Sequence, residues 1–283
     1  MRQIFKWRLP RTEIELGKRT AVIGILNVTP DSFSDGGLYL DVRAALARAL
    51  EMEAQGADVL DIGGESSRPG SEPVPEEEEL RRVLPVVEAL ADSLKIPISI
   101  DTYRSRVARN AIAAGAQIVN DISAFRFDRE MREVVRSTRA GVILMHSRGS
   151  REDLHRQLPM NDALWEVHED LQIAACAATE AGIAREAIVL DPGIGFGKTA
   201  EESLTVLRNL QGFSRLEYPL VIGTSRKSFL RKIVPGGSVP DPKNRLWGTA
   251  ATVASGVLRG AHIVRVHDVA EMRMLVDTLD ALF

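Results

Sequence analysis

The stretch AIVLDPG, residues 187–193, is an apolar run that stops abruptly at a carboxylate and a proline. A continuous run of this kind is typical of a strand buried on both faces of a parallel sheet. The fold class is therefore decided by how often the pattern recurs. Seven other runs share it: TAVIGILNV (20–28), ADVLDIGG (57–64), IPISIDT (96–102), AQIVNDI (116–122), GVILMHS (141–147), PLVIGTS (219–225) and HIVRVHD (262–268).

Longer segments with helical patterning separate these runs, for example residues 41–57 and 76–94. Eight strand-and-helix units predict an α/β fold, a single-domain (β/α)8 TIM barrel over residues 20–283. Residues 1–19 are predicted to be a short N-terminal extension, a hairpin that caps the bottom of the barrel. Several of the helical segments end in a glycine just before the next strand, which is the usual residue after a helix C-terminus: Gly56, Gly115, Gly182 and Gly260.

Two local features have ordinary structural interpretations. Four consecutive glutamates from Glu76 follow Pro75, and we expect them to complement the dipole in the first turn of a helix. Cys176 lies in an Ala-rich helical stretch and is expected to pack there. As the only cysteine, it excludes an internal disulfide and a multi-cysteine zinc site, and the five histidines have no metal-ligand spacing.

Composition narrows the class of partner. The formal net charge of −3 gives no overall attraction to nucleic acid or to an anionic membrane, so neither is an expected partner. The N-terminal segment has no apolar core typical of a secretory signal, and no run approaches the length of a membrane span. We therefore expect a cytoplasmic protein whose ligand is a small molecule.

Polar side chains end each apolar run, and in a parallel barrel all of these ends meet at one rim. The sequence therefore predicts a polar pocket built from many loops. Three of the strand-end residues are Asn27, Asp61 and His146. Of these, His146 is expected to be a hydrogen-bonded core histidine. One half of the pocket supplies acceptors and an amide for a flat heterocycle with N–H donors: Asp101, Asn120 and Asp191. The other half supplies positive charge for an anion such as phosphate: Arg68, Arg226, Lys227, Arg265 and His267.

The stretch DPGIGFGKT, residues 191–199, has the letters of a nucleotide-binding loop but not its spacing. A P-loop requires a glycine where Pro192 stands, and the dinucleotide pattern requires one where Lys198 stands. The glycines instead let the backbone turn closely beneath a ligand, and Asp191 is the informative residue. We conclude that this is not a nucleotide loop.

Seven motifs together resemble the dihydropteroate synthase family of pterin-binding enzymes. They occur in order, at strand ends, across nearly the whole chain: GILNVTPDSFSDGG (24–37), DIGGESSRPG (61–70), SIDT (99–102), VNDISAF (119–125), DPGIGFGKT (191–199), GTSRKSFL (223–230) and RVHDV (265–269). The resemblance implies a transferase that condenses (7,8-dihydropterin-6-yl)methyl diphosphate with 4-aminobenzoate. The products would be 7,8-dihydropteroate and diphosphate, in folate biosynthesis, at a site that is a sulfonamide target.

The resemblance also implies residue roles. Asp101, Asn120 and Asp191 would hold the ring N–H and amino groups, Lys227 would donate to the acceptor edge, and Met145 and Phe196 would pack on the ring face. Ser67 and Arg68 would close over the diphosphate that Arg265 and His267 grip, while Asp35 would stabilise cationic charge. Asn27 would ligate a Mg2+ that the diphosphate also binds. Phe33, Pro69, Gly223 and Ser228 complete the implied substrate-binding set.

The implied mechanism separates charge. Breaking the C–O bond leaves positive charge on the pterin methylene and negative charge on the leaving group, and a dissociative route is our hypothesis. The implied catalytic residues are Asp35, Arg68, Lys227, Arg265 and His267. Two alternatives stay open: a pterin-binding methyltransferase acting on methyltetrahydrofolate, and an inactive pterin-binding paralogue. By resemblance, a homodimer is expected.

Overall fold

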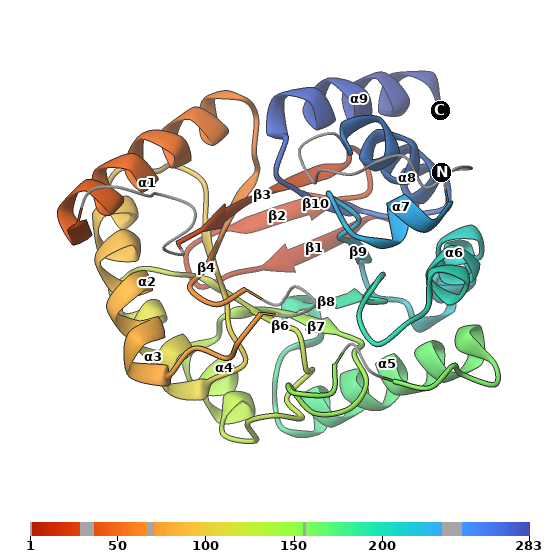
Figure 1. Ribbon diagram of the computed structural model, residues 1–283, viewed down its shortest axis with the longest axis horizontal. Helices are drawn as coiled ribbons and strands as arrows, with labels where there is room; N and C mark the ends of the chain where they lie inside the picture. Colours follow the sequence, from red (N-terminus) through yellow and green to blue (C-terminus); the bar gives the residue numbers. More distant parts are fainter. Residues whose placement is uncertain (1, 29–36, 67–70, 155–156, 234–244) are drawn as a thin grey trace.

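The computed structural model describes residues 2–28, 37–66, 71–154, 157–233 and 245–283. All eight predicted strands are present in one parallel sheet, and helices surround it (Figure 1). The predicted TIM barrel is therefore confirmed. Its strands are β3 (Ala21–Asn27), β4 (Val59–Gly63), β5 (Ile98–Asp101), β6 (Ile118–Asp121), β7 (Gly141–Met145), β8 (Ile188–Asp191), β9 (Val221–Ile222) and β10 (Ile263–Val266).

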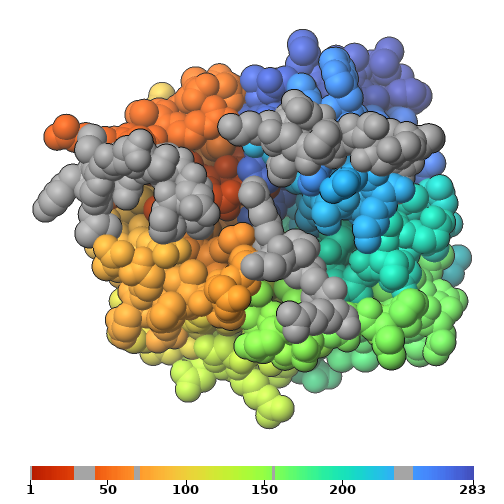
Figure 2. Space-filling model, in the orientation of Figure 1, coloured from red at the N-terminus to blue at the C-terminus, as the bar shows by residue number. Residues whose placement is uncertain are grey.

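The strand order β8-β7-β6-β5-β4-β3-β10-β9 runs around the barrel in chain order, and the ring closes between β8 and β9. Few backbone contacts make this closure. It consists of a single bridge from Leu190 to Leu220 and a hydrogen bond of 3.0 Å from the Leu190 amide to the Pro219 carbonyl. In contrast, β3 and β4 share five register pairs. Successive segments of the chain therefore form successive sectors around the molecule (Figure 2).

Helices follow the strands as the sequence predicts. The four glycines expected after helix C-termini all have positive φ. The angle is 94° at Gly56, 127° at Gly115, 89° at Gly182 and 102° at Gly260. No helix in the described part of the chain is long and apolar enough to cross a membrane. The helices are α1 (Gly37–Ala54), α2 (Glu76–Ala91), α3 (Ser105–Ala114), α4 (Met131–Thr138), α5 (Ala163–Glu180), α6 (Ala200–Arg208), α7 (Phe229–Ile233), α8 (Leu246–Leu258) and α9 (Val269–Leu282), with 3-10 turns at Arg185–Ala187 and Leu210–Leu216.

The prediction for the four glutamates is confirmed, since they form the first turn of α2. Glu79 is in addition buried, where it forms an ion pair with Arg104 from the neighbouring loop. The expectation that Cys176 packs inward is wrong. Cys176 is exposed on α5, since the Ala-rich face that packs inward is made by residues such as Ala175 and Ala178. The local pattern identified this helix but not which side chain faces inward.

A two-stranded antiparallel hairpin, β1 (Phe5–Arg8) and β2 (Glu13–Leu16), precedes the barrel. Its Trp7 and Leu16 are fully buried and pack against the side chains inside the barrel, among them Ile23 and Ile143. The Trp7 indole also donates a hydrogen bond of 3.0 Å to the Ala187 carbonyl. The hairpin thus closes one end of the barrel interior, and a second, larger core fills the space between strands and helices.

We expect Trp7→Ala to lower the free energy of unfolding by about 3–5 kcal/mol, because it leaves a cavity in the plugged end of the barrel. Trp165 is 61% exposed on α5, so Trp165→Ala is the matched control and is expected to change stability by less than about 0.5 kcal/mol. Urea unfolding followed by circular dichroism measures both. Equal effects of the two substitutions would contradict the role of Trp7 as a plug.

Candidate active site

Four strand ends lie at the same level of the rim. The parallel register pairs Asn27 with Gly63, Gly63 with Asp101, and Asp101 with Asn120, so β3 to β6 present these residues side by side. Across the barrel, Met145 of β7 pairs with Asp191 of β8. The strand ends predicted to form a pocket therefore do meet at one mouth.

Asp61 holds this part of the rim together, although the only prediction made for it was its place at a strand end. Its side chain is fully buried, and its Oδ2 accepts hydrogen bonds from Arg265 Nε at 2.6 Å and from Asn120 Nδ2 at 3.0 Å. Arg265 also donates from Nη2 to Asp101 Oδ2 at 2.5 Å. One buried carboxylate thus fixes a cation and an amide that belong to different halves of the predicted pocket.

Asp61, Asp101 and Arg265 lie close enough for their charges to shift the pKa values of Asp101 and Arg265. Burial raises the pKa of Asp101 to about 7; the positive charge of Arg265 opposes this rise and the negative charge of Asp61 adds to it. Burial disfavours the charged form of Arg265, but Asp61 and Asp101 outweigh that effect and hold its pKa above the ordinary value. The Arg265 guanidinium is therefore a permanent cation at the mouth of the barrel, with acidic groups against one side.

A second group of residues lies where β8 and β9 end. Asp191 Oδ1 accepts a hydrogen bond of 2.7 Å from the Gly193 amide, and burial raises the pKa of its carboxyl, an effect that Lys227 opposes. Lys227 donates to the Ile194 carbonyl and its Nζ lies 4.3 Å from the centre of the Phe196 ring. Burial lowers the pKa of Lys227 to about 7, against the attraction of Asp191. This lysine can therefore act as a donor whose charge responds to what binds beside it.

An apolar patch accompanies these polar groups. Met145 and Phe196, both predicted to pack on a flat ring, lie in one buried cluster with Ile122 and Leu154. Phe196 also lies under the Lys227 ammonium. A planar ligand at the mouth would therefore meet apolar surface on one side and acceptors at its edge, which is the usual composition of a small-molecule site.

The loop after β8 does not cradle a phosphate. Lys198, the lysine that resembles a P-loop residue, donates to its own loop, to the carbonyls of Gly193 at 3.0 Å and Phe196 at 3.2 Å. The loop turns through positive φ at Gly193 (64°), and a Cβ there would lie 1.9 Å from the His146 carbonyl oxygen. The lysine and glycines therefore stabilise a tight loop that aims Asp191 at the rim.

His146 is a core histidine, as predicted. Its Nδ1 lies 2.6 Å from Lys198 Nζ, and Asp170 lies 3.2 Å from its Nε2. Burial, followed by the charge of Lys198, lowers the pKa of His146 to about 4. At neutral pH the ring is uncharged, and its Nδ1 accepts from the lysine that closes the loop.

The loops after β9 and β10 carry further predicted site residues. Ser225 Oγ lies 3.0 Å from His267 Nδ1 and accepts from the His267 amide, so it orients the ring at the rim. Gly223 lies between two cations of the site, since a Cβ there would be in ordinary contact with Lys227 Nζ at 3.8 Å and Arg265 Cβ at 3.9 Å. Ser228 is exposed on the same loop.

Arg226 does not join the predicted anion site. Its Nε donates to Asp268 Oδ2 at 3.1 Å, and the two side chains form an ion pair. The backbone of Arg226 has a φ of 57°, and its amide donates to Thr249 at 3.1 Å. The chain thus turns between Arg226 and Lys227, and only the lysine faces Asp191. Five predicted site residues lie outside the described residues: Phe33, Asp35, Ser67, Arg68 and Pro69.

Asn27 is the residue that the resemblance assigns to Mg2+. A Cβ placed on Gly63 would lie 3.8 Å from Asn27 Oδ1 and 3.6 Å from Asp101 Oδ2, so both oxygens face the same space. Among the described residues, no three His, Cys, Asp or Glu side chains gather as a metal site. Mg2+ keeps most of its coordination sphere for water and phosphate oxygens, so a single amide oxygen at this rim fits such an ion.

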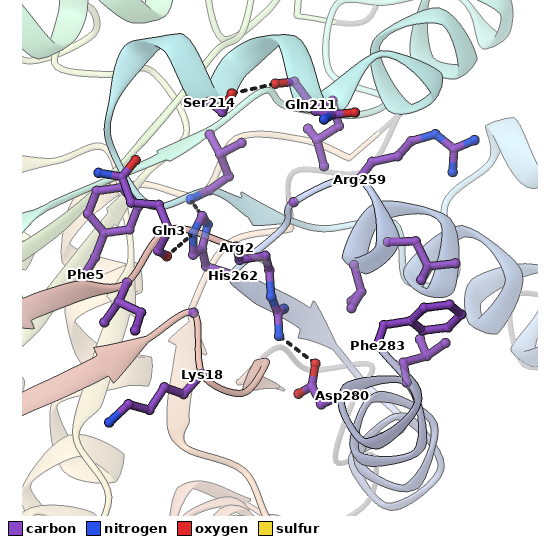
Figure 3. A pocket seen from close by; sticks show the side chains of 18 of the residues that line it. Arg2, Gln3, Phe5, Lys18, Gln211, Ser214, Arg259, His262, Asp280 and Phe283 are labelled. Atoms are coloured by element: carbon purple, nitrogen blue, oxygen red, sulfur yellow. Dashed lines mark hydrogen bonds and ion pairs between the residues drawn. The ribbon is translucent and has the colours of Figure 1, made fainter.

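A cavity of about 600 Å3 lies between the N-terminal segment and the C-terminal helix, beside the starts of the last strands rather than their ends (Figure 3). Its polar groups already bond one another. Arg2 Nη2 donates to Asp280 at 2.5 Å, and His262 Nε2 lies 3.1 Å from the Gln3 carbonyl. Of the predicted site residues that the structure describes, none lines this cavity, so we take the rim as the candidate active site.

Comparison with known proteins finds relatives over nearly the whole chain. A family model described as "Pterin binding enzyme" matches residues 23–267. A dihydropteroate synthase of Synechocystis sp. is 47% identical over 96% of this chain and 93% of its own length. A dihydropteroate synthase of Bacillus subtilis is 45% identical over 94% of this chain and 89% of its own length.

Solved structures agree with these relatives. Xanthomonas albilineans dihydropteroate synthase with 4-aminobenzoic acid has a TM-score of 0.91 at 39% identity, covering 99% of this chain and 98% of its own. The same enzyme in complex with 7,8-dihydropteroate has a TM-score of 0.84 at 38% identity, covering 95% of each chain. Yersinia pestis dihydropteroate synthase with a sulfonamide drug has a TM-score of 0.90 at 36% identity, covering 98% of this chain and 99% of its own.

The buried neutral His146 gives stability a defined pH dependence. Its pKa in the folded chain, about 4, is below the ordinary value of 6.5, so the unfolded chain binds the proton first. The stabilisation is fully present above pH 6.5 and is lost as the pH falls toward 4, at a total cost of about 3 kcal/mol.

His146→Gln keeps an acceptor for Lys198 but removes this titration. The difference in free energy of unfolding between wild type and variant should therefore shift by about 3 kcal/mol in favour of the variant between pH 7 and pH 4. Urea unfolding across this range measures it, with His168→Gln on α5 as the control. A difference that does not change with pH would refute the assignment.

Proposed function

The chain belongs to the pterin-binding enzyme family, and we propose that it is a dihydropteroate synthase that condenses (7,8-dihydropterin-6-yl)methyl diphosphate with 4-aminobenzoate. The products are 7,8-dihydropteroate and diphosphate. The observation that carries the proposal is the contact of Arg265 with Asp61 and Asp101 at the rim. It places a fixed cation directly beside acceptors for a donor-rich ring, which is what a pterin with a diphosphate tail requires.

The described residues recognise the ring. The carboxylates of Asp101 and Asp191 and the amide of Asn120 accept from the pterin N–H and amino groups, and paired hydrogen bonds to a carboxylate fix both position and orientation. Lys227 donates to the acceptor edge of the ring, and Met145 and Phe196 pack against its face. Binding of a neutral, N–H-rich ring also satisfies carboxyl groups that burial makes costly to ionise alone.

Residues at the rim also stabilise the charges that form during the reaction. When the C–O bond breaks, the bonding electrons leave with the diphosphate, and Arg265 and His267 stabilise that negative charge. The carboxylates around the ring favour the positive charge left on the pterin methylene, a role that the resemblance also gives to Asp35, which lies outside the described residues. The 4-aminobenzoate amine then attacks that carbon and loses a proton. Mg2+, held in part by the Asn27 oxygen, would supply further positive charge for the leaving group.

The direct test measures diphosphate release from the dihydropterin diphosphate, with and without 4-aminobenzoate and Mg2+. We expect release with both present and a strong loss after EDTA, restored by added Mg2+. Slow release without the amine in single turnovers would support the dissociative order of events. Sulfonamides should compete with 4-aminobenzoate. If no dihydropteroate forms under any of these conditions, the proposed function is wrong.

The two halves of the site make separable predictions. Asp191→Ala should weaken binding of a pterin without a diphosphate at least tenfold, because a ring acceptor is lost. Arg265→Ala should leave that binding within about threefold but lower kcat at least a hundredfold, because one charge-stabilising donor is lost. Asp61→Asn should lower kcat and also weaken ring binding, since it loosens both Arg265 and Asn120. Calorimetry and steady-state kinetics measure both, and equal losses of ring binding in all three variants would contradict the division.

We also propose a homodimer that acts in the cytoplasm. Support for the dimer comes from α8 and α9, where Trp247 is 82% and Phe283 is 81% exposed, an unusual exposure for large apolar side chains. Trp247→Lys should shift the mass found by light scattering from two chains toward one. Trp165→Lys, on α5 and separated from α8 by α6, is the control. A wild-type mass of one chain at micromolar concentration would rule out the dimer, and cell fractionation tests the location.

A further inference from the structure

The lysine of the motif GFGKT, Lys198, takes no direct part in the chemistry above, but it contacts the loop after β8 in two places. Its ammonium donates to the carbonyl of Gly193 at 3.0 Å and to that of Phe196 at 3.2 Å. It also lies 2.6 Å from Nδ1 of His146, the residue that follows β7. One ammonium group therefore binds two points of a turn and joins that turn to the neighbouring loop.

The turn that Lys198 holds is also bonded to Asp191. The Asp191 carboxylate accepts from the Gly193 amide at 2.7 Å, and the Phe196 amide donates to the Gly193 carbonyl at 3.0 Å. The His146 amide donates to the Asp191 carbonyl at 2.8 Å. Loss of the lysine bonds would therefore loosen the turn that directs the Asp191 carboxylate and carries the Phe196 ring.

Lys198 also acts on the charge of Asp191. Burial raises the pKa of the Asp191 carboxyl, and Lys227, the Gly193 amide and Lys198 oppose that rise. Desolvation lowers the pKa of Lys198 to about 7, and the negative charge of Asp191 opposes that fall. Each group therefore favours the charged form of the other, and a charged carboxylate offers only acceptors to the ring. Further charged groups that act on this pair are Arg148, Glu202 and Arg265.

Asp170 of α5 is linked to Lys198 through the ring of His146. Helix α5 packs against β7 and β8, and the Asp170 side chain is 59% exposed, with its Oδ2 3.2 Å from His146 Nε2. A neutral imidazole carries one N–H, and Nδ1 accepts from the ammonium, so the hydrogen lies on Nε2 and faces Asp170. The interaction with His146 lowers the pKa of Asp170, which keeps this carboxylate charged at neutral pH. Asp170 therefore favours the tautomer of His146 that can accept from Lys198.

We propose that Lys198 is a positioning residue for the pterin ring: it holds Asp191 and Phe196 in the arrangement that binds the ring. Asp170 supports this role from the surface, through His146. The inference rests on the proposed function, in which the two loop residues contact the ring.

The role is confined to the ring half of the site. Arg265 is held by Asp61 and Asp101, and Ser225 orients His267, so these contacts do not run through the loop after β8. Once the pterin site is saturated, the departure of the diphosphate and the attack of the amine should therefore proceed at nearly normal rates.

The test compares Lys198→Met, which keeps the length of the side chain but removes its charge and hydrogen bonds, with Lys95→Met. Lys95 is exposed before β5, so its substitution is the matched control and should behave like wild type. We expect Lys198→Met to raise the calorimetric Kd of a pterin lacking the diphosphate about tenfold, because the ring acceptor loses its fixed direction. KM for 4-aminobenzoate and kcat at saturating pterin should stay within about twofold of wild type. Asp170→Ala should raise the same Kd about threefold.

A double-mutant cycle separates positioning from a general loss of structure. In the Asp191→Asn background, Lys198→Met should raise the Kd less than about threefold, since the carboxylate on which it acts is already absent. An equal loss of ring affinity in both backgrounds would overturn the proposal, and so would a wild-type Kd in Lys198→Met.

Urea unfolding checks that each variant is folded. Should Lys198→Met not fold, Asp170→Ala decides the question from the surface, and an unchanged Kd in that variant would overturn the proposal. Calorimetry of ring binding requires no turnover. A wild-type protein that binds the pterin but makes no dihydropteroate would therefore refute the proposed function alone.

Discussion

The buried carboxylate of Asp61 is the constraint on which the mouth of the barrel depends. A guanidinium at the open end of a barrel has many conformations, and each would give a different electrostatic field. Asp61 Oδ2 removes this freedom, because it accepts from Arg265 and from Asn120 at the same time. The cation and the amide are then held in one relation before any ligand arrives, which is the preorganisation that charge stabilisation in a reaction requires.

In the proposed function, both halves of the site use side chains at the ends of strands, whose backbones are fixed by the parallel register. Asp101, Asn120 and Asp191 would bind the ring, and Arg265 of β10, held by Asp61, would face the leaving group. His267 lies on the loop just beyond β10, where Ser225 orients its ring. Ring recognition and charge stabilisation would therefore depend on the same rigid frame.

Sequence patterns predicted the barrel well because its strands and helices follow from local periodicity. The eight apolar runs and the glycines after the helices each depend on nearby residues alone. The roles of Asp61 and Arg226 could not be found in this way, because both depend on contacts between segments far apart in the chain. Arg226 and Lys227 are adjacent and both cationic, and only the positive φ of Arg226 and its pairing with Asp268 decide which one faces the site.

Few backbone contacts join β8 to β9, and two residues of the proposed site lie beside these contacts. Only Leu190 connects the two strands by backbone bonds, and Asp191 follows it directly, while Lys227 lies on the loop beyond the other strand. A pterin that binds both side chains would link β8 to β9, which share few backbone contacts. Protein with bound pterin would then resist separation of these two strands, so the supply of substrate would also affect how long each molecule survives in the cell.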